Sequence, residues 1–376
     1  LSPRGHGGAR GLSNRLACSM TVVVVDPLHP DPEVLAEAAA RLQRGELVAF
    51  PTETVYGLGA NALDPRAVER IYAAKGRPAW NPVIAHVADR AQARRLARHW
   101  PETADALAAA FWPGPLTLVV PRADTVPDVV TAGLDAVGLR VPDHPVALAL
   151  LRAAQVPVAA PSANRFTHIS PTTAAHVLRS LGDRAPLVLD GGTCRVGIES
   201  TVVDCSGSDV VILRPGMLGR EVLQDAVQHL GVLVRHAAPR HLAHDATRMS
   251  EGDTPRAPGM ADRHYAPRAD VWLFEPSQRD EIAAALALRA DTAPHGATPD
   301  PQAVVALLRT GPWQHASPVP LEQQLLPNDP AQYAAGLYAA LHEADARDSA
   351  LILLEAPPAD DPAWDAVRDR VRRAAR

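Results

Sequence analysis

Short apolar strands alternate with amphipathic helices along this sequence. Residues 21–25 form a β-branched run, and residues 47–50 form a second strand. Between them, residues 32–42 carry apolar side chains at helical spacing behind Asp31, a good N-cap residue. This alternation predicts an α/β fold. Because open α/β sheets bind ligands at strand ends, polar residues that follow the strands are the first candidates for a functional site.

Hydroxyls, a carboxylate and glycines crowd the end of the strand at 47–50, in residues 51–59 with the sequence PTETVYGLG. Thr52 is the first of these hydroxyls. The segment is not a dinucleotide-binding fingerprint, since no third glycine follows at the required spacing. Either these residues face a ligand or they form a Gly-rich turn with surface threonines.

Lys75 is the only lysine among the 37 basic Lys and Arg residues of the chain. Arginine is a flat fork, whereas lysine is a compact charge on a flexible stem, so a site that fits only a point charge explains the exception. Gly76 and Arg77 follow at once, and Pro78 and Pro82 stiffen the loop. Two cations on such a loop suit a polyphosphate or a carboxylate.

Two later strands each carry a polar residue in an apolar context. His86 lies in the strand at 83–87, where a histidine is usually a hydrogen-bonded core residue. Arg140 lies in the strand at 137–141, and a charge there must be paired or must face a ligand. For Arg140 we favour the ligand over an internal ion pair.

Further hydrogen-bonding residues follow later strands. Ser162 and Asn164 stand two residues apart after the strand at 156–160, and they aim at a ligand or cap the next helix. Ser170 is a predicted N-cap whose freed amides suit an anion. Ser200 lies beside glycine residues, and Arg214 ends the strand at 210–213.

The composition excludes several classes of protein. The chain has 376 residues and a net charge of −5, which gives no global basic field for nucleic acid. The three cysteines form no CxxC pair, so we expect no structural zinc and a cytoplasmic, reducing location. No apolar run approaches the ~20 residues of a membrane helix. Residues 1–19 lack a signal-peptide core and are expected to be a disordered or non-native extension.

The second part of the chain predicts a linker and a small domain. Residues 236–258 are rich in Ala, Pro, Arg and His without a period, and the three histidines there lack the spacing of metal ligands. A Met-His-Tyr cluster that includes Tyr265 then ends the linker. Beyond it, strands at 271–274, 303–308 and 350–355 alternate with helices at 279–289, 330–344 and 364–375. The expected boundaries are 20–230 for the first domain, 231–266 for the linker and 267–376 for the second domain.

Cations and hydrogen-bond donors without a Ser-His-Asp or Cys-His arrangement indicate nucleotide chemistry, in which positioning and charge neutralisation supply most of the rate. The residues alone therefore predict a nucleotide-binding transferase. They do not identify its second substrate.

Several motifs in the right order resemble the YrdC-domain family. They are PTETVYGLG at 51–59, Lys75-x-Arg77, Ser162-x-Asn164 and Glu199-Ser200-Thr201. The elements at 258–260 and 264–267, followed by a small α/β domain, look like the long, two-domain branch of L-threonylcarbamoyladenylate synthases. The resemblance implies an open, twisted mixed sheet with a concave basic cavity, and a Rossmann-like second domain tethered by a linker that folds over the cavity.

The resemblance also implies an activity and its participants. L-Threonine, bicarbonate (or CO2) and ATP give threonylcarbamoyl-AMP and pyrophosphate, and a partner transferase then modifies tRNA next to the anticodon. Lys75 and Arg77 would neutralise the triphosphate, with Mg²⁺ held mainly by the phosphates and no metal site on the protein. The remaining roles are nucleotide binding by Ser162, Asn164, Ser170, Arg214 and Tyr265, and threonine binding by Thr52, His86, Arg140 and Ser200.

Two alternatives stay open at this stage. One is an RNA-binding YrdC-type module without synthase activity, which the net charge and the 4% aromatic content disfavour. The other is carbamoyl transfer from carbamoyl phosphate, although the zinc-finger CxxC of such proteins is absent. The sequence leaves undetermined the oligomeric state, the linker path, the role of the second domain, direct tRNA contact and whether Met20 is the true start.

Overall fold

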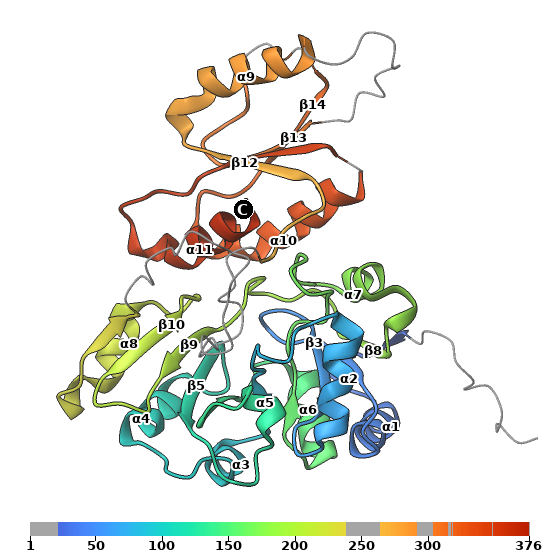
Figure 1. The fold of residues 1–376 in the computed structure, drawn as a ribbon, viewed down its shortest axis with the longest axis vertical. Helices are drawn as coiled ribbons and strands as arrows, with labels where there is room; N and C mark the ends of the chain where they lie inside the picture. Colours follow the sequence, from blue (N-terminus) through green and yellow to red (C-terminus); the bar gives the residue numbers. More distant parts are fainter. Residues whose placement is uncertain are drawn as a thin grey trace, which may run out of the picture.

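A computed structural model describes residues 22–237, 264–291, 304–314, 317, 319–347 and 349–375 (Figure 1). The expected extension at 1–19 and most of the expected linker, with His241, His244 and residues 258–260, lie outside the described residues. Within the described part of the chain, no helix has the length and apolar character to cross a membrane.

The first domain is built on one mixed sheet of eleven strands in the order β1-β8-β2-β3-β7-β4-β6-β5-β9-β10-β11. β8 pairs in parallel with β1 and β2, whereas β3 runs antiparallel to β2 and β7. The strands are β1 Val22–Val24, β2 Val48–Phe50, β3 Gly57–Asn61, β4 Ala85–His86, β5 Leu116–Pro121, β6 Ala136–Arg140, β7 Val158–Ala159, β8 Leu187–Asp190, β9 Thr201–Asp204, β10 Val210–Arg214 and β11 Val234–His236.

Helices cover both faces of this sheet. Alternate residues of β2 point to opposite sides: Val48 and Phe50 join the core under α1 and α6, while Ala49 joins the core under the other helices. The helices are α1 Pro32–Gln43, α2 Pro65–Lys75, α3 Arg90–Arg95, α4 Glu102–Phe111, α5 Asp128–Thr131, α6 Pro145–Ala154, α7 Ala174–Leu181 and α8 Arg220–Val227.

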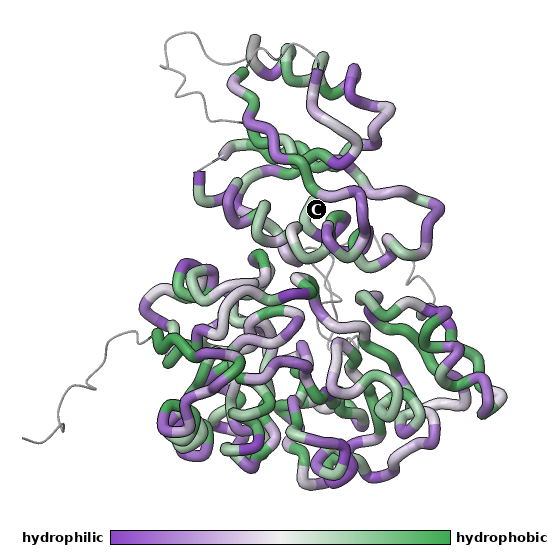
Figure 2. Tube along the Cα trace, turned by 180° about the vertical axis from the view of Figure 1, so that it is seen from behind, coloured by the Kyte–Doolittle hydropathy of each residue, from purple (hydrophilic) through white to green (hydrophobic). Residues whose placement is uncertain are grey.

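The second domain is a parallel sheet in the order β12-β15-β13-β14. Its strands are β12 Asp270–Phe274, β13 Val304–Leu308, β14 Leu321–Leu325 and β15 Leu351–Glu355, and its helices are α9 Arg279–Asp291, α10 Pro330–Ala346 and α11 Asp365–Ala374. Hydrophobic residues gather along the strands of both domains (Figure 2). α10 and α11 lie on the side that faces the first domain, and α9 lies on the opposite side (Figure 1).

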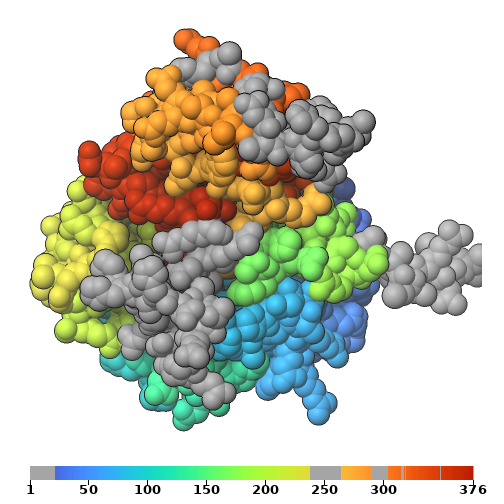
Figure 3. Space-filling model, turned by 45° about the horizontal axis from the view of Figure 1, so that its top comes forward, coloured from blue at the N-terminus to red at the C-terminus, as the bar shows by residue number. Residues whose placement is uncertain are grey.

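The two domains are in direct contact, and the second covers part of the first (Figure 3). Gly197 in the first domain has φ +77, and a Cβ built there would lie 2.5 Å from the backbone oxygen of Ala334 in α10. Only a glycine allows this approach, because the two backbones leave no room for a side chain.

The structure corrects several expectations. The Gly-rich turn considered at 51–59 is wrong from Gly57 onward, where β3 begins; a Cβ on Gly59 would lie 2.8 Å from the Phe50 ring, so small residues are needed there. The polar edge strand β14 was not expected. β11 extends the sheet into the segment expected to start the linker, and the domain boundaries stay predictions.

Candidate functional site

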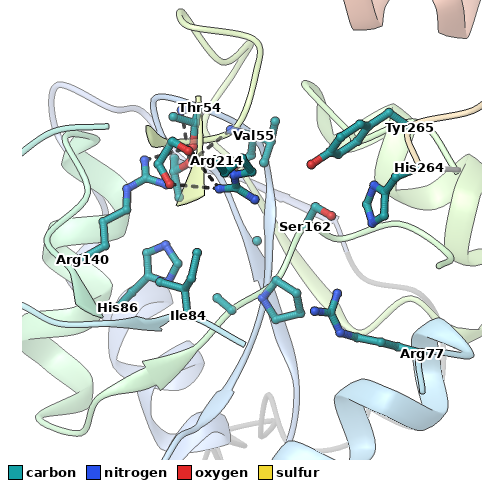
Figure 4. Close-up of a pocket in the computed structure, with 15 residues that line it drawn as sticks. Thr54, Val55, Arg77, Ile84, His86, Arg140, Ser162, Arg214, His264 and Tyr265 are labelled. Atoms are coloured by element: carbon teal, nitrogen blue, oxygen red, sulfur yellow. Dashed lines mark hydrogen bonds between the residues drawn. The ribbon is translucent and has the colours of Figure 1, made fainter. Parts of the chain in front are cut away.

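A cavity opens where several strands of the first domain end, and most of the sequence-predicted residues line it (Figure 4). Arg140 and His86 lie on one side, and Arg77, His264 and Tyr265 lie on the other. The lining residues are Thr52, Thr54, Val55, Gly57, Arg77, Ile84, His86, Arg140, Ala160, Pro161, Ser162, Ser200, Arg214, His264 and Tyr265. The cavity wall therefore combines cationic and hydroxyl side chains from residues that lie far apart in the sequence, between Thr52 and Tyr265.

Arg140 is a buried cation held in a fixed orientation. Its Nη2 lies 2.7 Å from a carboxylate oxygen of Glu53, which is completely buried, and donates to Thr54 Oγ1 at 2.9 Å. Its Nε donates to the Gly114 carbonyl at 3.2 Å. The ion-pair interpretation of Arg140 is therefore confirmed, while its binding of a ligand stays a prediction that its place in the cavity wall permits. A guanidinium fixed in this way suits a carboxylate ligand.

The neighbouring polar groups are neutral or locked by short hydrogen bonds. Burial and the charge of Arg140, its register partner across β4 and β6, lower the pKa of His86 to about 3, so the ring is neutral. Thr52 donates to the Val55 carbonyl at 2.7 Å. Ser200 Oγ lies 2.8 Å from Thr117 Oγ1 and accepts from Arg214 Nη2 at 3.2 Å. This side of the cavity is therefore preorganised for a small polar ligand.

Lys75 is the last residue of α2, Gly76 caps this helix with φ 62, and Arg77 follows. Lys75 Nζ donates to the backbone oxygens of Ser162 and Asn164 at 2.5 and 2.6 Å. Burial, together with nearby Arg77, lowers the pKa of Lys75 well below its usual value. Arg77 Nη2 donates to Asn81 Oδ1 at 2.6 Å, and burial lowers its pKa to about 10, which leaves it charged at neutral pH.

Three predicted residues do not line the cavity: Lys75, Asn164 and Ser170 are 3%, 0% and 0% exposed. Lys75 instead supports the backbone of the Ser-x-Asn turn, and Asn164 Nδ2 donates to the His168 carbonyl at 2.7 Å. Ser170 Oγ donates to Glu199 Oε1 at 2.6 Å. These residues lie one layer behind the cavity wall.

The site contains residues that sequence reasoning missed. Glu53 and Thr54 belong to the PTET segment but were not assigned roles. His264 adjoins Tyr265, and its ring lies 5.8 Å from the Phe166 ring. Both His264 Nδ1 and the Tyr265 hydroxyl are buried without a hydrogen-bond partner among the described residues. The sequence places His264 in the Met-His-Tyr cluster but gives it no role of its own.

The described residues contain no group of three His, Cys, Asp or Glu side chains placed to hold a metal ion. The two carboxylates nearest the cavity, Glu53 and Glu199, are each paired with an arginine. Of the three linker histidines, His236 lies in β11 and the other two fall outside the described ranges.

The fold and the cavity define a class: a two-domain α/β protein in which an open mixed sheet carries a cationic, hydroxyl-lined cavity and a parallel-sheet domain packs against the first domain. The YrdC/YciO/Sua5 family model, described as telomere recombination, matches residues 40–216, and the model described as threonylcarbamoyl-AMP synthase, C-terminal domain, matches residues 220–376. The chain belongs to the two-domain threonylcarbamoyl-AMP synthase family, the Sua5 type.

Relatives from two other organisms support this membership. The chain is 47% identical to the threonylcarbamoyl-AMP synthase of Pyrococcus abyssi over 65% of this chain and 68% of that protein. It is 45% identical to the Bacillus subtilis enzyme of the same name over 68% of this chain and 71% of that protein. The crystal structure of P. abyssi Sua5 complexed with L-threonine matches with a TM-score of 0.80 and 38% identity, over 95% of this chain and 98% of that chain.

Proposed function

We propose that this chain makes L-threonylcarbamoyl-AMP from L-threonine, bicarbonate or CO2 and ATP, with release of pyrophosphate, as the first step of threonylcarbamoyladenosine modification of tRNA. The observation that carries the proposal is the division of one cavity into two cationic sides, with Arg140 on one and Arg77 on the other (Figure 4). A reaction between an amino acid and a nucleotide needs both.

The chemistry needs no protein nucleophile. The amine of threonine attacks CO2 and loses a proton, which forms a carbamate. A carbamate oxygen then attacks the α-phosphorus of ATP, and pyrophosphate leaves. The work of the protein is to align the two substrates and to neutralise negative charge.

The threonine side is organised around Arg140, which pairs with the carboxylate of threonine. Its orientation by Glu53 and Thr54 supports this role. Thr52, His86 and Ser200 bind the other polar groups of the amino acid. A neutral His86 adds no charge that would compete with Arg140 for the carboxylate.

The nucleotide side is organised around Arg77, with Lys75 behind it. Arg77 neutralises the phosphates directly, while Lys75 holds the turn that carries Ser162 and Asn164, of which Ser162 reaches the cavity. Arg214 and Tyr265 complete the nucleotide contacts, and Asn164 and Ser170 support them from behind the cavity wall. The phosphates of ATP would hold Mg²⁺, which would supply further charge neutralisation beside Arg77. A tRNA threonylcarbamoyl transferase then consumes the product.

The test is pyrophosphate release from ATP and Mg²⁺, with L-threonine and bicarbonate each omitted in turn, for the wild type and Lys75→Ala. We expect release to require both substrates and to fall steeply in the variant. Release that is indifferent to threonine would contradict the proposed function.

A further inference from the structure

Glu199 lies where the two domains meet, and its carboxylate binds groups from both. Oε1 accepts from Ser170 Oγ of the first domain at 2.6 Å. Oε2 accepts from the Tyr338 hydroxyl in α10 at 3.0 Å and from Arg370 Nε in α11 at 2.7 Å. The residue is 7% exposed. The second domain therefore reaches a residue that contacts Ser170, one of the proposed nucleotide-binding residues.

Arg370 belongs to a row of alternating charges. It is completely buried, and its Nη1 lies 2.6 Å from Asp369 Oδ2. Asp369 Oδ1 in turn accepts from Arg373 Nε at 2.9 Å. Glu199, Arg370, Asp369 and Arg373 thus form two negative and two positive charges that balance one another. Loss of Arg370 alone leaves a buried carboxylate without its cation, which is costly in an interior of low polarity.

The charge of Glu199 acts on the nucleotide side of the cavity. Burial lowers the pKa of Lys75 and of Arg214, and the negative charge of Glu199 opposes this lowering at both residues. Both cations belong to the set proposed to bind or support the phosphates. An uncompensated Glu199 would attract these cations away from the ligand and would repel a triphosphate.

We propose that Arg370 of the second domain is a positioning residue for ATP, which acts by neutralising Glu199 and by holding the Ser170 hydroxyl through it. The second domain is then part of the electrostatics of the site and not only its cover. This inference rests on the proposed function, since it deepens the nucleotide half of the same site.

The test compares the affinity of full-length variants for ATP in the presence of Mg²⁺, measured by calorimetry without turnover. Arg370→Met should weaken ATP binding about tenfold, because Glu199 keeps its charge without a partner. The double variant Glu199→Gln/Arg370→Met should recover to within about threefold of the wild type, since Gln carries no charge and its amide can still bond both hydroxyls, accepting from one of Ser170 and Tyr338 and donating to the other. If the Arg370–Glu199 pair only holds the two domains together, the double variant should bind ATP no more tightly than Arg370→Met.

Arg279→Met is the matched control, because Arg279 makes a comparable ion pair at 3.0 Å with the buried Glu355 inside the second domain, away from the cavity. It should leave ATP affinity within about twofold of the wild type. If Arg370→Met does not fold, Tyr338→Phe removes one donor to Glu199 and should weaken ATP binding about threefold. Unchanged affinity in Arg370→Met, or equal loss in Arg279→Met, overturns the inference. Tight ATP binding without threonine-dependent pyrophosphate release would instead contradict the proposed function alone.

Discussion

Two buried arginine–glutamate pairs flank the cavity, and they are arranged in opposite ways. In both, the closest nitrogen and oxygen lie 2.7 Å apart. Arg140 faces the cavity and Glu53 stands behind it, with both residues in the first domain. In the other pair, Glu199 is nearer the nucleotide residues, and Arg370 stands behind it in the second domain. One pair thus places a cation at the cavity. The other, similar pair neutralises an anion near the nucleotide residues.

The arrangement determines which function is lost when the arginine of each pair is replaced, and whether a second substitution can restore it. In the proposed function Arg140 is the group that pairs with the threonine carboxylate, so no change at Glu53 should restore binding once Arg140 is removed. Removal of Arg370 exposes a charge, and a second change at Glu199 can remove that charge again. The predictions below test this difference.

The largest effect is expected at Arg140. Arg140→Met should lower kcat/KM for L-threonine about 100-fold or more, because it removes a buried cation that pairs with the substrate carboxylate. Steady-state kinetics at saturating ATP measure this. The double variant Glu53→Gln/Arg140→Met should regain thermal stability but not threonine affinity. Recovery of threonine affinity in the double variant would show that the two pairs behave alike, and it would contradict the proposed difference between them.

The junction pair should matter for stability as well. Glu199→Ala leaves Arg370 buried without its main partner and should lower the free energy of unfolding by about 3 kcal/mol. Glu199→Gln also removes the charge, but its amide can still bond the hydroxyls of Ser170 and Tyr338, so it should lower the free energy of unfolding less. Urea unfolding of both variants measures the difference. Equal losses would show that the charge, which both variants lack, accounts for the whole effect and that the hydrogen bonds add nothing.

Acid should weaken the junction through His342, which stacks on His176 with ring centroids 3.9 Å apart and contacts the Ser170 carbonyl at 3.1 Å. Burial and His176 lower the pKa of His342 to about 3, below the ordinary value of about 6.5. As the pH falls, His342 therefore takes up a proton in the unfolded chain before it does so in the folded protein. Stability is complete above pH ~6.5 and falls by up to about 1.4 kcal/mol per unit as the pH drops toward 4.

His342→Gln removes this proton uptake, so unfolding followed from pH 8 to 4 should show a shallower loss than in the wild type. At pH 8, where His342 is neutral in both the folded and the unfolded state, the free energies of unfolding of the two proteins should differ only by an amount that does not depend on pH. Parallel curves over the whole range would exclude His342 as the source.

The smallest effect is expected at Thr54, the second support of Arg140. Thr54→Val removes one hydrogen bond while Glu53 still holds the guanidinium, so KM for L-threonine should rise about fivefold. Thr54→Ser, which keeps the hydroxyl, is the matched control and should stay near the wild type. An effect as large as that of Arg140→Met would mean that Thr54 itself contacts the substrate.

The residues of the cavity wall could be predicted because polarity at a strand end is a local signal. His86, Arg140, Ser162 and Arg214 each stand out against apolar neighbours in the sequence, and all four line the cavity. β3 was harder, since its glycines read as a turn until the Phe50 ring is in place beside them.

The junction gave no such signal. Arg370 is one of several arginines in α11, and its partner Glu199 lies 171 residues earlier. Only the docking of the two domains selects this arginine from its neighbours. Lys75 illustrates a smaller limit: its rarity marked a special position, but the sequence did not reveal that its ammonium binds the backbone of the Ser-x-Asn turn.

The close approach of Gly197 to α10 has a consequence for how this protein can change over time. A methyl group at this position would act as a wedge against the backbone at Ala334 and Ala335. Such a wedge would lift the helix that carries Tyr338, and with it one hydrogen bond to Glu199. The sequences of the two domains therefore cannot change independently of each other at this contact. A chimera that exchanges the second domain between relatives must keep glycine here, or it loses the register on which the junction depends.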